Sequence, residues 1–190
     1  MSNSFDLFIC RDFDAGADRC GGFKNSLLYR AVTGYGIARN EAETLILLRT
    51  KNGKPFFENS DICFNISHSR DTWACLMGLS CCGLDIQYIR PCDHEKIAGR
   101  FFSPAEQRYV MENGADGFFD IWVRREAYGK FTGDGFFGKC PEFVLNGKLQ
   151  DRFPGDIRIV PVDLGPAYDG LKCAVCAEGP VEVSNIREDW

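Results

Sequence analysis

The chain has 190 residues, 45% of them hydrophobic and 13% aromatic, which is typical of a globular protein and excludes a disordered one. Its formal net charge of -5 argues against nucleic acid as a partner, because such a binder needs a basic field. Ten cysteines occur without a basic-then-apolar export signal, so we expect reduced thiols and no disulfide framework. No apolar run approaches the roughly 20 residues that cross a bilayer. The sequence therefore predicts a cytoplasmic protein without membrane contact.

The first half of the chain is expected to begin and end with strands. Its expected elements are, in order, a strand over residues 5–10, a helix after residue 22, a short helix over 41–49, a turn at 52–55, and strands over 62–66, 73–79 and 83–89. The first helix is predicted because Leu27, Leu28, Ala31 and Val32 recur at helical spacing. The turn is predicted because its sequence, Asn-Gly-Lys-Pro, is typical of turns.

The second half is expected to contain helices followed by strands. The helices are predicted over residues 93–101, from residue 103, and over 122–131, and the tail is predicted to form strands with tight hairpin turns at Asn146-Gly147 and Asp169-Gly170. Ser103, Pro104 and Glu106 together make a capping box with proline in the first turn. Because both halves mix helices and strands, the predicted fold class is α+β, in a single unit of residues 1–190.

Three segments carry the residues with chemical potential. Asp85 ends an apolar run, which is as typical of a turn or helix cap as of a metal ligand. Glu126 and Lys130 are four residues apart, on one helix face, as a solvated ion pair or as part of a site. Ser67-His68-Ser69 is either a turn whose hydroxyls bind the backbone or a phosphate-binding segment. A Ser67 nucleophile with His68 as its base is disfavoured, because sequence neighbours rarely face each other.

Five motifs follow one another between residues 53 and 130. They are Gly53-Lys54-Pro55, Asn65-Ile66-Ser67-His68-Ser69, Gly83-Leu84-Asp85-Ile86-Gln87, Phe101-Phe102-Ser103-Pro104-Ala105-Glu106 and Trp122-Val123-Arg124-Arg125-Glu126-Ala127-Tyr128-Gly129-Lys130. In this order they resemble the motifs of the 4′-phosphopantetheinyl transferases of the surfactin-synthetase type. The resemblance runs from about residue 26 to residue 130, with looser similarity over the C-terminal strands.

The resemblance implies a fold and a reaction. The fold is a pseudo-dimer of two similar α/β halves, about residues 1–88 and 89–190, with the site in the cleft between them. The reaction transfers the 4′-phosphopantetheine arm of coenzyme A to a serine of an apo acyl or peptidyl carrier protein, depends on Mg²⁺, and releases adenosine 3′,5′-bisphosphate. The carrier would belong to fatty-acid, polyketide or nonribosomal-peptide synthesis. A monomer is expected because both half-sites lie in one chain.

The resemblance also implies a role for each site residue. Asp85 and Glu126 are expected to be Mg²⁺ ligands, with Gln87 at a third ligand position. Glu126 is also the expected general base towards the carrier serine. Lys130 is expected to contact the pyrophosphate of coenzyme A and to take part in catalysis. The residues expected to bind coenzyme A are Lys54, Pro55, Ser67, His68, Lys130 and Ser26.

Departures from the family pattern lead to two alternatives. Gln87 stands where the family carries a second acidic residue, so one formal negative charge is missing and we expect weaker Mg²⁺ binding. Arg125 replaces a lysine and keeps its charge. The basic residues that approach the 3′-phosphate in the family have no clear match here, and Arg19 and Lys24 are the candidates for that role. One alternative function is a non-catalytic relative that binds coenzyme A or a carrier protein. The other is a metal-dependent nucleotide hydrolase that uses the same carboxylates.

A surface that docks an acidic carrier protein has to be local in a chain of negative net charge. The arginines at positions 100, 108, 124 and 125 form either a basic patch that steers the carrier or an ordinary solvated face. The phenylalanines at positions 118, 119, 136 and 137 are mostly expected in the core, and an exposed one would contact the carrier.

Overall fold

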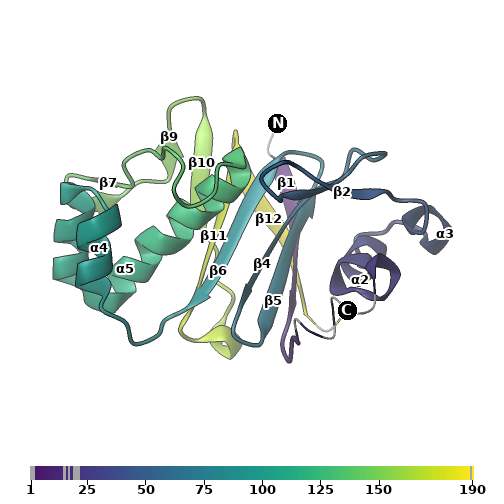
Figure 1. The fold of residues 1–190 in the computed structure, drawn as a ribbon, viewed down its shortest axis with the longest axis horizontal. Helices are drawn as coiled ribbons and strands as arrows, with labels where there is room; N and C mark the ends of the chain where they lie inside the picture. The colour runs from purple at the N-terminus through teal and green to yellow at the C-terminus, as the bar shows by residue number, and fades with distance from the viewer. Residues whose placement is uncertain (1–2, 15, 17, 19–21, 189) are drawn as a thin grey trace.

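The computed structural model describes residues 3–14, 16, 18, 22–188 and 190, and these residues contain two four-stranded sheets (Figure 1). The first sheet has the order β12 (Val181–Glu188), β1 (Asn3–Cys10), β5 (Thr72–Gly78) and β4 (Cys63–Ser69). The second has the order β6 (Cys82–Tyr88), β11 (Leu171–Glu178), β10 (Ile157–Pro161) and β9 (Arg152–Phe153). Short hairpins are formed by β2 (Leu47–Arg49) with β3 (Pro55–Phe57) and by β7 (Val144–Leu145) with β8 (Lys148–Leu149).

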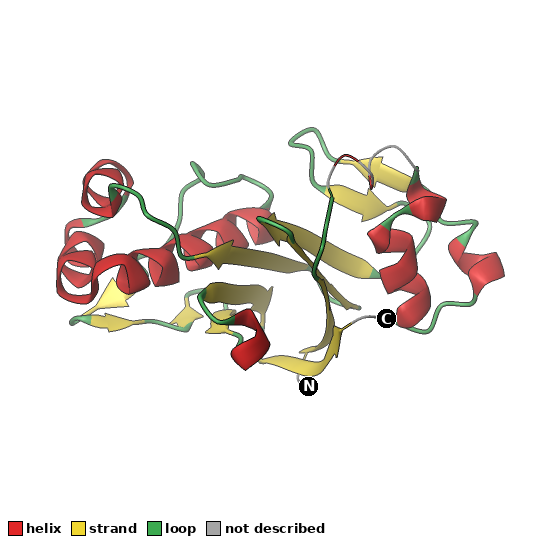
Figure 2. Ribbon diagram, turned by 90° about the horizontal axis from the view of Figure 1, so that it is seen from below, coloured by secondary structure: helices red, strands yellow, loops and turns green. Residues whose placement is uncertain are grey.

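The α-helices gather at the two ends of the molecule with the large sheets between them, as Figure 2 shows. At one end lie α2 (Leu27–Gly34) and α3 (Arg39–Ala42), and at the other α4 (His94–Phe101) and α5 (Pro104–Thr132). Two short 3₁₀ helices, η1 (Phe23–Asn25) and η2 (Pro166–Tyr168), complete the described elements. This mixture of helices and mainly antiparallel strands confirms the predicted α+β class.

The apolar side chains form three clusters because each strand points alternate residues to opposite faces. On β1, Phe5 and Leu7 belong to a cluster shared by both sheets, whereas Phe8 belongs to the cluster under α2. On β11, Val175 joins the shared cluster and Cys176 joins the cluster under α4 and α5. The shared cluster therefore holds the two sheets together, and each outer sheet face has its own helical cover.

The two sheets also meet edge to edge, at β4 and β6. These strands are the end strands of their sheets and lie side by side in the middle of the molecule (Figure 1). Helix α5 crosses β6 at Gly83, where an added Cβ would lie 2.0 Å from the Ala127 carbonyl oxygen and 2.6 Å from the Phe131 nitrogen. Because only glycine allows this approach, the last turns of α5 come down onto the β6 face that carries Asp85, two residues further along.

Several predicted elements are confirmed. The strand over residues 5–10 corresponds to β1, and the helix after residue 22 corresponds to α2. The capping box of Ser103 and Glu106 begins α5 as predicted. The Asn146-Gly147 turn joins β7 to β8 with positive φ at both residues, 52° and 73°, which is the conformation that such a two-residue hairpin needs.

Four other predictions are wrong in detail. The helix expected over 41–49 ends at Ala42, and Leu47–Arg49 forms β2 because it pairs with β3. The helices expected from 103 and over 122–131 belong to one element, α5, which is interrupted at Gly114 with φ of 62°. Ser67 to Ser69 belong to strand β4 and do not form a turn. The Asp169-Gly170 segment is not a tight hairpin turn. It ends a longer connection from β10 to β11 that contains η2, because Tyr168 packs into the shared core.

The buried thiols match the prediction of reduced cysteines in the core. Cys75, Cys82, Cys173 and Cys176 are buried and free, and desolvation by burial raises the pKa of each thiol. Such thiols behave as small apolar groups. Within the described part of the chain, no helix combines the length and the apolar character that crossing a membrane requires.

Candidate active site

The predicted carboxylates and the predicted lysine meet where α5 crosses β6. Asp85 is 5% exposed and its Oδ1 accepts a hydrogen bond from Lys130 Nζ at 2.7 Å. Ser67, on the facing edge of β4, donates its hydroxyl to the same Asp85 oxygen at 2.8 Å. Lys130 Nζ also donates to Ser67 Oγ at 2.9 Å. Asp85, Lys130 and Ser67 thus form a closed triangle of hydrogen bonds that joins β4, β6 and α5.

Glu126 lies one helical turn before Lys130 and completes the charged group. Burial raises the pKa of the Glu126 carboxyl, the negative charge of Asp85 adds to that rise, and Lys130 offsets part of it. Burial likewise raises the pKa of Asp85 against the lowering effect of Lys130 and Ser67. Among the described residues the Glu126 carboxylate has no hydrogen-bond or ion-pair partner. Asp85 and Glu126 thus bring two carboxylates to a place with one ammonium, which pairs with Asp85, and this excess of negative charge suits a cation.

The donor set fits Mg²⁺. Magnesium prefers oxygen ligands and completes its shell with water and substrate phosphates, and Asp85 and Glu126 supply two carboxylates. Gln87 donates its amide nitrogen to Ser69 Oγ at 3.0 Å and to the Tyr88 carbonyl oxygen at 3.2 Å, which leaves its amide oxygen for a ligand or a bound water. No cluster of three His, Cys, Asp or Glu side chains within the described residues holds a metal unaided. A metal here would therefore need phosphate and water ligands.

The residues expected to bind coenzyme A are only partly brought together. Ser67 lies in the triangle, whereas the neighbouring His68 points to the other side of β4, where it is exposed and its ring contacts Phe13 at 5.4 Å. Lys54 donates to the carbonyl oxygens of Cys82 and Phe131, both at 3.2 Å. Lys54 therefore ties the end of α5 to the start of β6 and lies at the same junction as the triangle.

The other sequence-predicted contacts lie in the first half of the chain. Pro55 is the first residue of β3. Ser26 caps α2, because its hydroxyl accepts from Tyr29 N at 3.2 Å and donates to the Phe23 carbonyl oxygen at 2.7 Å. Lys24 pairs with Glu43 at 3.3 Å, and Arg19 lies outside the described residues. A direct role for any of these residues in ligand binding stays a prediction.

The proposed patch of four arginines is wrong as a surface feature. Arg124 is 4% exposed and pairs with Asp151 at 2.9 Å. The Arg125 side chain is 12% exposed, pairs with the buried Glu106 at 3.4 Å, and lies over the ring of Phe102 at 5.4 Å. Of these four arginines, only those at positions 100 and 108 are exposed. Arg124 and Arg125 are buried because they face the sheet and the α4–α5 contact, which helix spacing alone does not reveal.

The structure adds two site residues that the sequence reasoning missed. Asn65 and Ser69 belong to the same β4 face as Ser67, and both are buried at 4% and 5% exposure. A signal for them was present, because polar residues at 65, 67 and 69 alternate with the period of a strand. The interpretation of residues 67–69 as either a turn or a phosphate-binding segment did not use this alternation.

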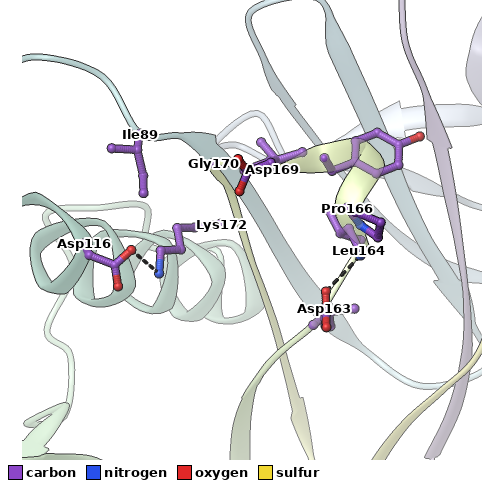
Figure 3. Close-up of a pocket in the computed structure, with 12 residues that line it drawn as sticks. Ile89, Asp116, Asp163, Leu164, Pro166, Asp169, Gly170 and Lys172 are labelled. Carbon is purple, nitrogen blue, oxygen red and sulfur yellow. Dashed lines mark hydrogen bonds and ion pairs between the residues drawn. The ribbon is translucent and has the colours of Figure 1, made fainter.

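A separate pocket lies near η2 and contains none of the residues of the triangle (Figure 3). Its lysine, Lys172, is neutralised by Asp116 at 2.8 Å and by Asp120 at 3.0 Å. Asp163 and Asp169 add further negative charge to its wall. This pocket is therefore unfavourable for a phosphate, and the junction of β4, β6 and α5 is the better candidate site.

Part of the chain matches a known protein family. Residues 81–151 match the family model of the 4'-phosphopantetheinyl transferase superfamily, and this range includes Asp85, Glu126 and Lys130. The chain belongs to this superfamily. It is similar to 4'-phosphopantetheinyl transferase gsp of Aneurinibacillus migulanus, with 30% identity over 71% of this chain and 59% of the relative.

Two further relatives show the same relationship. The chain is 30% identical to 4'-phosphopantetheinyl transferase psf-1 of Bacillus pumilus over 76% of this chain and 66% of that protein. It is 39% identical to 4'-phosphopantetheinyl transferase HetI of a Nostoc species over 44% of this chain and 39% of that protein. The chain thus spans between 39% and 66% of the length of these three relatives.

Proposed function

We propose that the protein transfers the 4′-phosphopantetheine arm of coenzyme A to a serine of an apo acyl or peptidyl carrier protein. The observation that carries the proposal is the arrangement of Asp85, Glu126 and Lys130 at a sheet junction, in which the buried Asp85 pairs with Lys130 and the half-buried Glu126 lies one helical turn away, without a partner among the described residues. Similarity to relatives that are named phosphopantetheinyl transferases supports the same reaction.

In the proposed reaction the carrier serine oxygen attacks the phosphorus that bears the pantetheine arm. The bond from this phosphorus to the bridging pyrophosphate oxygen breaks, and adenosine 3′,5′-bisphosphate leaves with the electron pair. Glu126 accepts the serine proton as the general base. Lys130 places its positive charge on the pyrophosphate oxygens.

Mg²⁺ is the metal we propose for this site, held by Asp85 and Glu126 with the amide oxygen of Gln87 beside them. When bound, the ion would neutralise the pyrophosphate and the charge that develops on the leaving group. Lys130 now donates to Asp85. Because a bound cation and the lysine would compete for the same carboxylate oxygen, we expect Lys130 to turn towards the phosphates when the site is loaded.

We further propose that coenzyme A lies in a cleft between two similar halves of the chain, about residues 1–88 and 89–190. Each half contributes most of one four-stranded sheet, and the two sheets meet at β4 and β6. Each half also gives one strand to the sheet of the other half. β6, from the first half, pairs with β11, and β12, from the second half, pairs with β1. Both halves that would border the cleft thus belong to one chain, which supports a monomer.

Exposed residues beside α4 and α5 are our proposed contacts for the carrier protein. Phe137 is 83% exposed and packs against the Phe101 ring at 5.7 Å. Arg100 is exposed and lies over the same Phe101 ring at 5.2 Å. An apolar tip with an adjacent positive charge is complementary to an acidic carrier surface.

The buried free thiols support a cytoplasmic location, where thiols remain reduced.

The second candidate function is a non-catalytic relative that binds coenzyme A or a carrier protein. Gln87 favours it, because its amide nitrogen is used in two hydrogen bonds and its side chain brings no charge to the metal position. A binding protein of this kind would keep Lys54 and His68 and would lack transfer activity.

Intact-mass spectrometry of apo carrier proteins separates the two candidates. Each carrier is incubated with the protein, coenzyme A and Mg²⁺, and addition of one phosphopantetheine group is the expected result. Asp85→Ala is expected to abolish the addition, whereas Asp61→Ala, a control at an exposed aspartate, is expected to keep it. If no carrier is modified while calorimetry still detects coenzyme A binding, the protein is the non-catalytic relative.

A further inference from the structure

Three side chains of β4 connect it to β6. Asn65, Ser67 and Ser69, which we call the seam residues, are spaced two apart and are all buried. The three contacts run from Leu84 N to Asn65 Oδ1 at 2.9 Å, from Ile86 N to Ser67 Oγ at 3.2 Å, and from Tyr88 N to Ser69 Oγ at 3.0 Å. The acceptors and the donors both advance by two residues, so the seam residues fix the register of β4 against β6.

These side-chain contacts take the place of backbone hydrogen bonds between β4 and β6. β4 and β6 are the end strands of different sheets, so the outward N–H groups of β6 have no strand of their own sheet to pair with. A buried N–H without a partner is costly. The seam residues supply the missing acceptors and keep the two edges one side chain apart. Asp85 lies next to this junction, on the β6 face that α5 covers.

Ser67 uses its full hydrogen-bonding capacity inside this junction. A hydroxyl has one donor and two acceptor positions. Its proton goes to Asp85 Oδ1 at 2.8 Å, and its oxygen accepts from Ile86 N at 3.2 Å and from Lys130 Nζ at 2.9 Å. One side chain therefore touches the β6 backbone, the carboxylate and the ammonium.

We infer that the seam residues are positioning residues and that Ser67 orients Asp85 for metal binding instead of contacting the 3′-phosphate of coenzyme A. The seam holds the backbone on both sides of Asp85, and Ser67 fixes the direction in which its carboxylate points. A residue that orients a metal-binding carboxylate in this way is typically worth 10–100-fold in metal affinity. The effect on catalysis rests on the proposed function, whereas the effect on the β6 backbone does not.

The first test measures the seam without any ligand. Amide hydrogen exchange is followed in the wild type, in Ser67→Ala, and in Ser184→Ala, which removes a serine pair between the exposed hydroxyls of β1 and β12. The Ile86 amide is expected to exchange about tenfold faster in Ser67→Ala, the factor that corresponds to one hydrogen bond, and at the wild-type rate in the control. Unchanged exchange at Ile86 in Ser67→Ala would overturn the inference.

The second test separates positioning from phosphate contact. Calorimetry measures the affinity for Mg²⁺ in the presence of coenzyme A, and the affinities for coenzyme A and 3′-dephospho-coenzyme A. Positioning predicts about 10–100-fold weaker Mg²⁺ binding in Ser67→Ala, with the ratio of the two coenzyme affinities unchanged. A lower preference for coenzyme A over its dephospho form, with wild-type Mg²⁺ affinity, would assign Ser67 to the phosphate and contradict us.

Two further variants of Ser67 complete these tests. If Ser67→Ala does not fold, Ser67→Cys keeps the volume and weakens the donor and the acceptor, and the same faster exchange and weaker Mg²⁺ binding are expected. Ser67→Thr keeps the hydroxyl and is expected to restore both readouts. Because neither readout requires a carrier protein, a wild type without transferase activity would refute the proposed function and still leave the seam open to test.

Discussion

Two buried acidic residues pair with basic residues of α5, and they differ in how completely their oxygens are used. Glu106 is 1% exposed and accepts from Ser103 N at 2.9 Å, from Phe143 N at 3.0 Å and from Arg125 at 3.4 Å. Asp85 accepts through one oxygen, Oδ1, from Lys130 and Ser67.

The neighbours of these two residues differ as well. Arg125 is enclosed by the rings of Phe102, Phe136 and Phe143, whereas Lys130 is more exposed and has the unpartnered Glu126 one turn away among the described residues. A buried charge with all of its oxygens satisfied supports the fold. Buried charges in excess of their partners mark a place where a ligand has to supply the balance. The comparison indicates a structural role for Glu106 and supports the proposed role of Asp85 and Glu126 in ligand binding.

The largest expected effect is on activity. Glu126→Gln removes the proposed base and one metal ligand, so transfer to the carrier is expected to fall by about 10²–10⁴-fold, while the melting temperature stays the same or rises. Initial rates of carrier modification and a thermal melt measure the two quantities. A melting temperature that falls together with the activity would instead place Glu126 in the architecture.

The next effect is on stability. Glu106→Ala leaves Arg125 as an uncompensated buried charge and opens the capping box, so the free energy of unfolding is expected to fall by about 3–5 kcal/mol. Denaturant titration gives this value. Glu112→Ala, at an exposed glutamate of the same helix, is the control and is expected to change stability by less than about 0.5 kcal/mol. Equal losses in both variants would contradict the comparison.

A smaller effect is expected where α5 approaches β6. Gly83→Ala places a Cβ against the α5 backbone, so we expect a loss of about 1–3 kcal/mol in the free energy of unfolding and weaker Mg²⁺ binding as the proposed ligands Glu126 and Asp85 move apart. Gly99→Ala is the matched control. The added Cβ at position 99, within α4, meets no heavy atom within 4 Å, and alanine there is expected to stabilise the helix by up to about 1 kcal/mol.

The smallest effect is a pH dependence of stability. The folded state raises the pKa of Glu126, so it binds the proton more tightly than the unfolded state does, and the free energy of unfolding falls as pH rises from the unfolded pKa through the folded one. Glu126→Gln removes this contribution. Without metal, its stability relative to the wild type is therefore expected to increase with pH across that range. Denaturant titrations at several pH values measure the difference, and a difference that decreases with pH would show that the pKa is lowered.

The local elements of the fold were the most predictable from sequence. The capping box of α5, the Asn146-Gly147 hairpin and the helix at Leu28 were predicted correctly, because each depends on residues a few positions apart. The helix expected over 41–49 failed because pairing of β2 with β3 overrides local preference.

The sequence by itself determined the α+β class, the spacing of Glu126 and Lys130 on one helix face, and the family to which the chain belongs. These follow from local patterns and from ordered motifs. Only the tertiary structure decided that Lys130 reaches Asp85, 45 residues away, and Ser67, 63 residues away. It also decided that Arg124 and Arg125 are buried. The physical reason is that these contacts depend on which strand edges meet and on how closely α5 crosses β6 at Gly83, and both depend on packing between segments far apart in the chain.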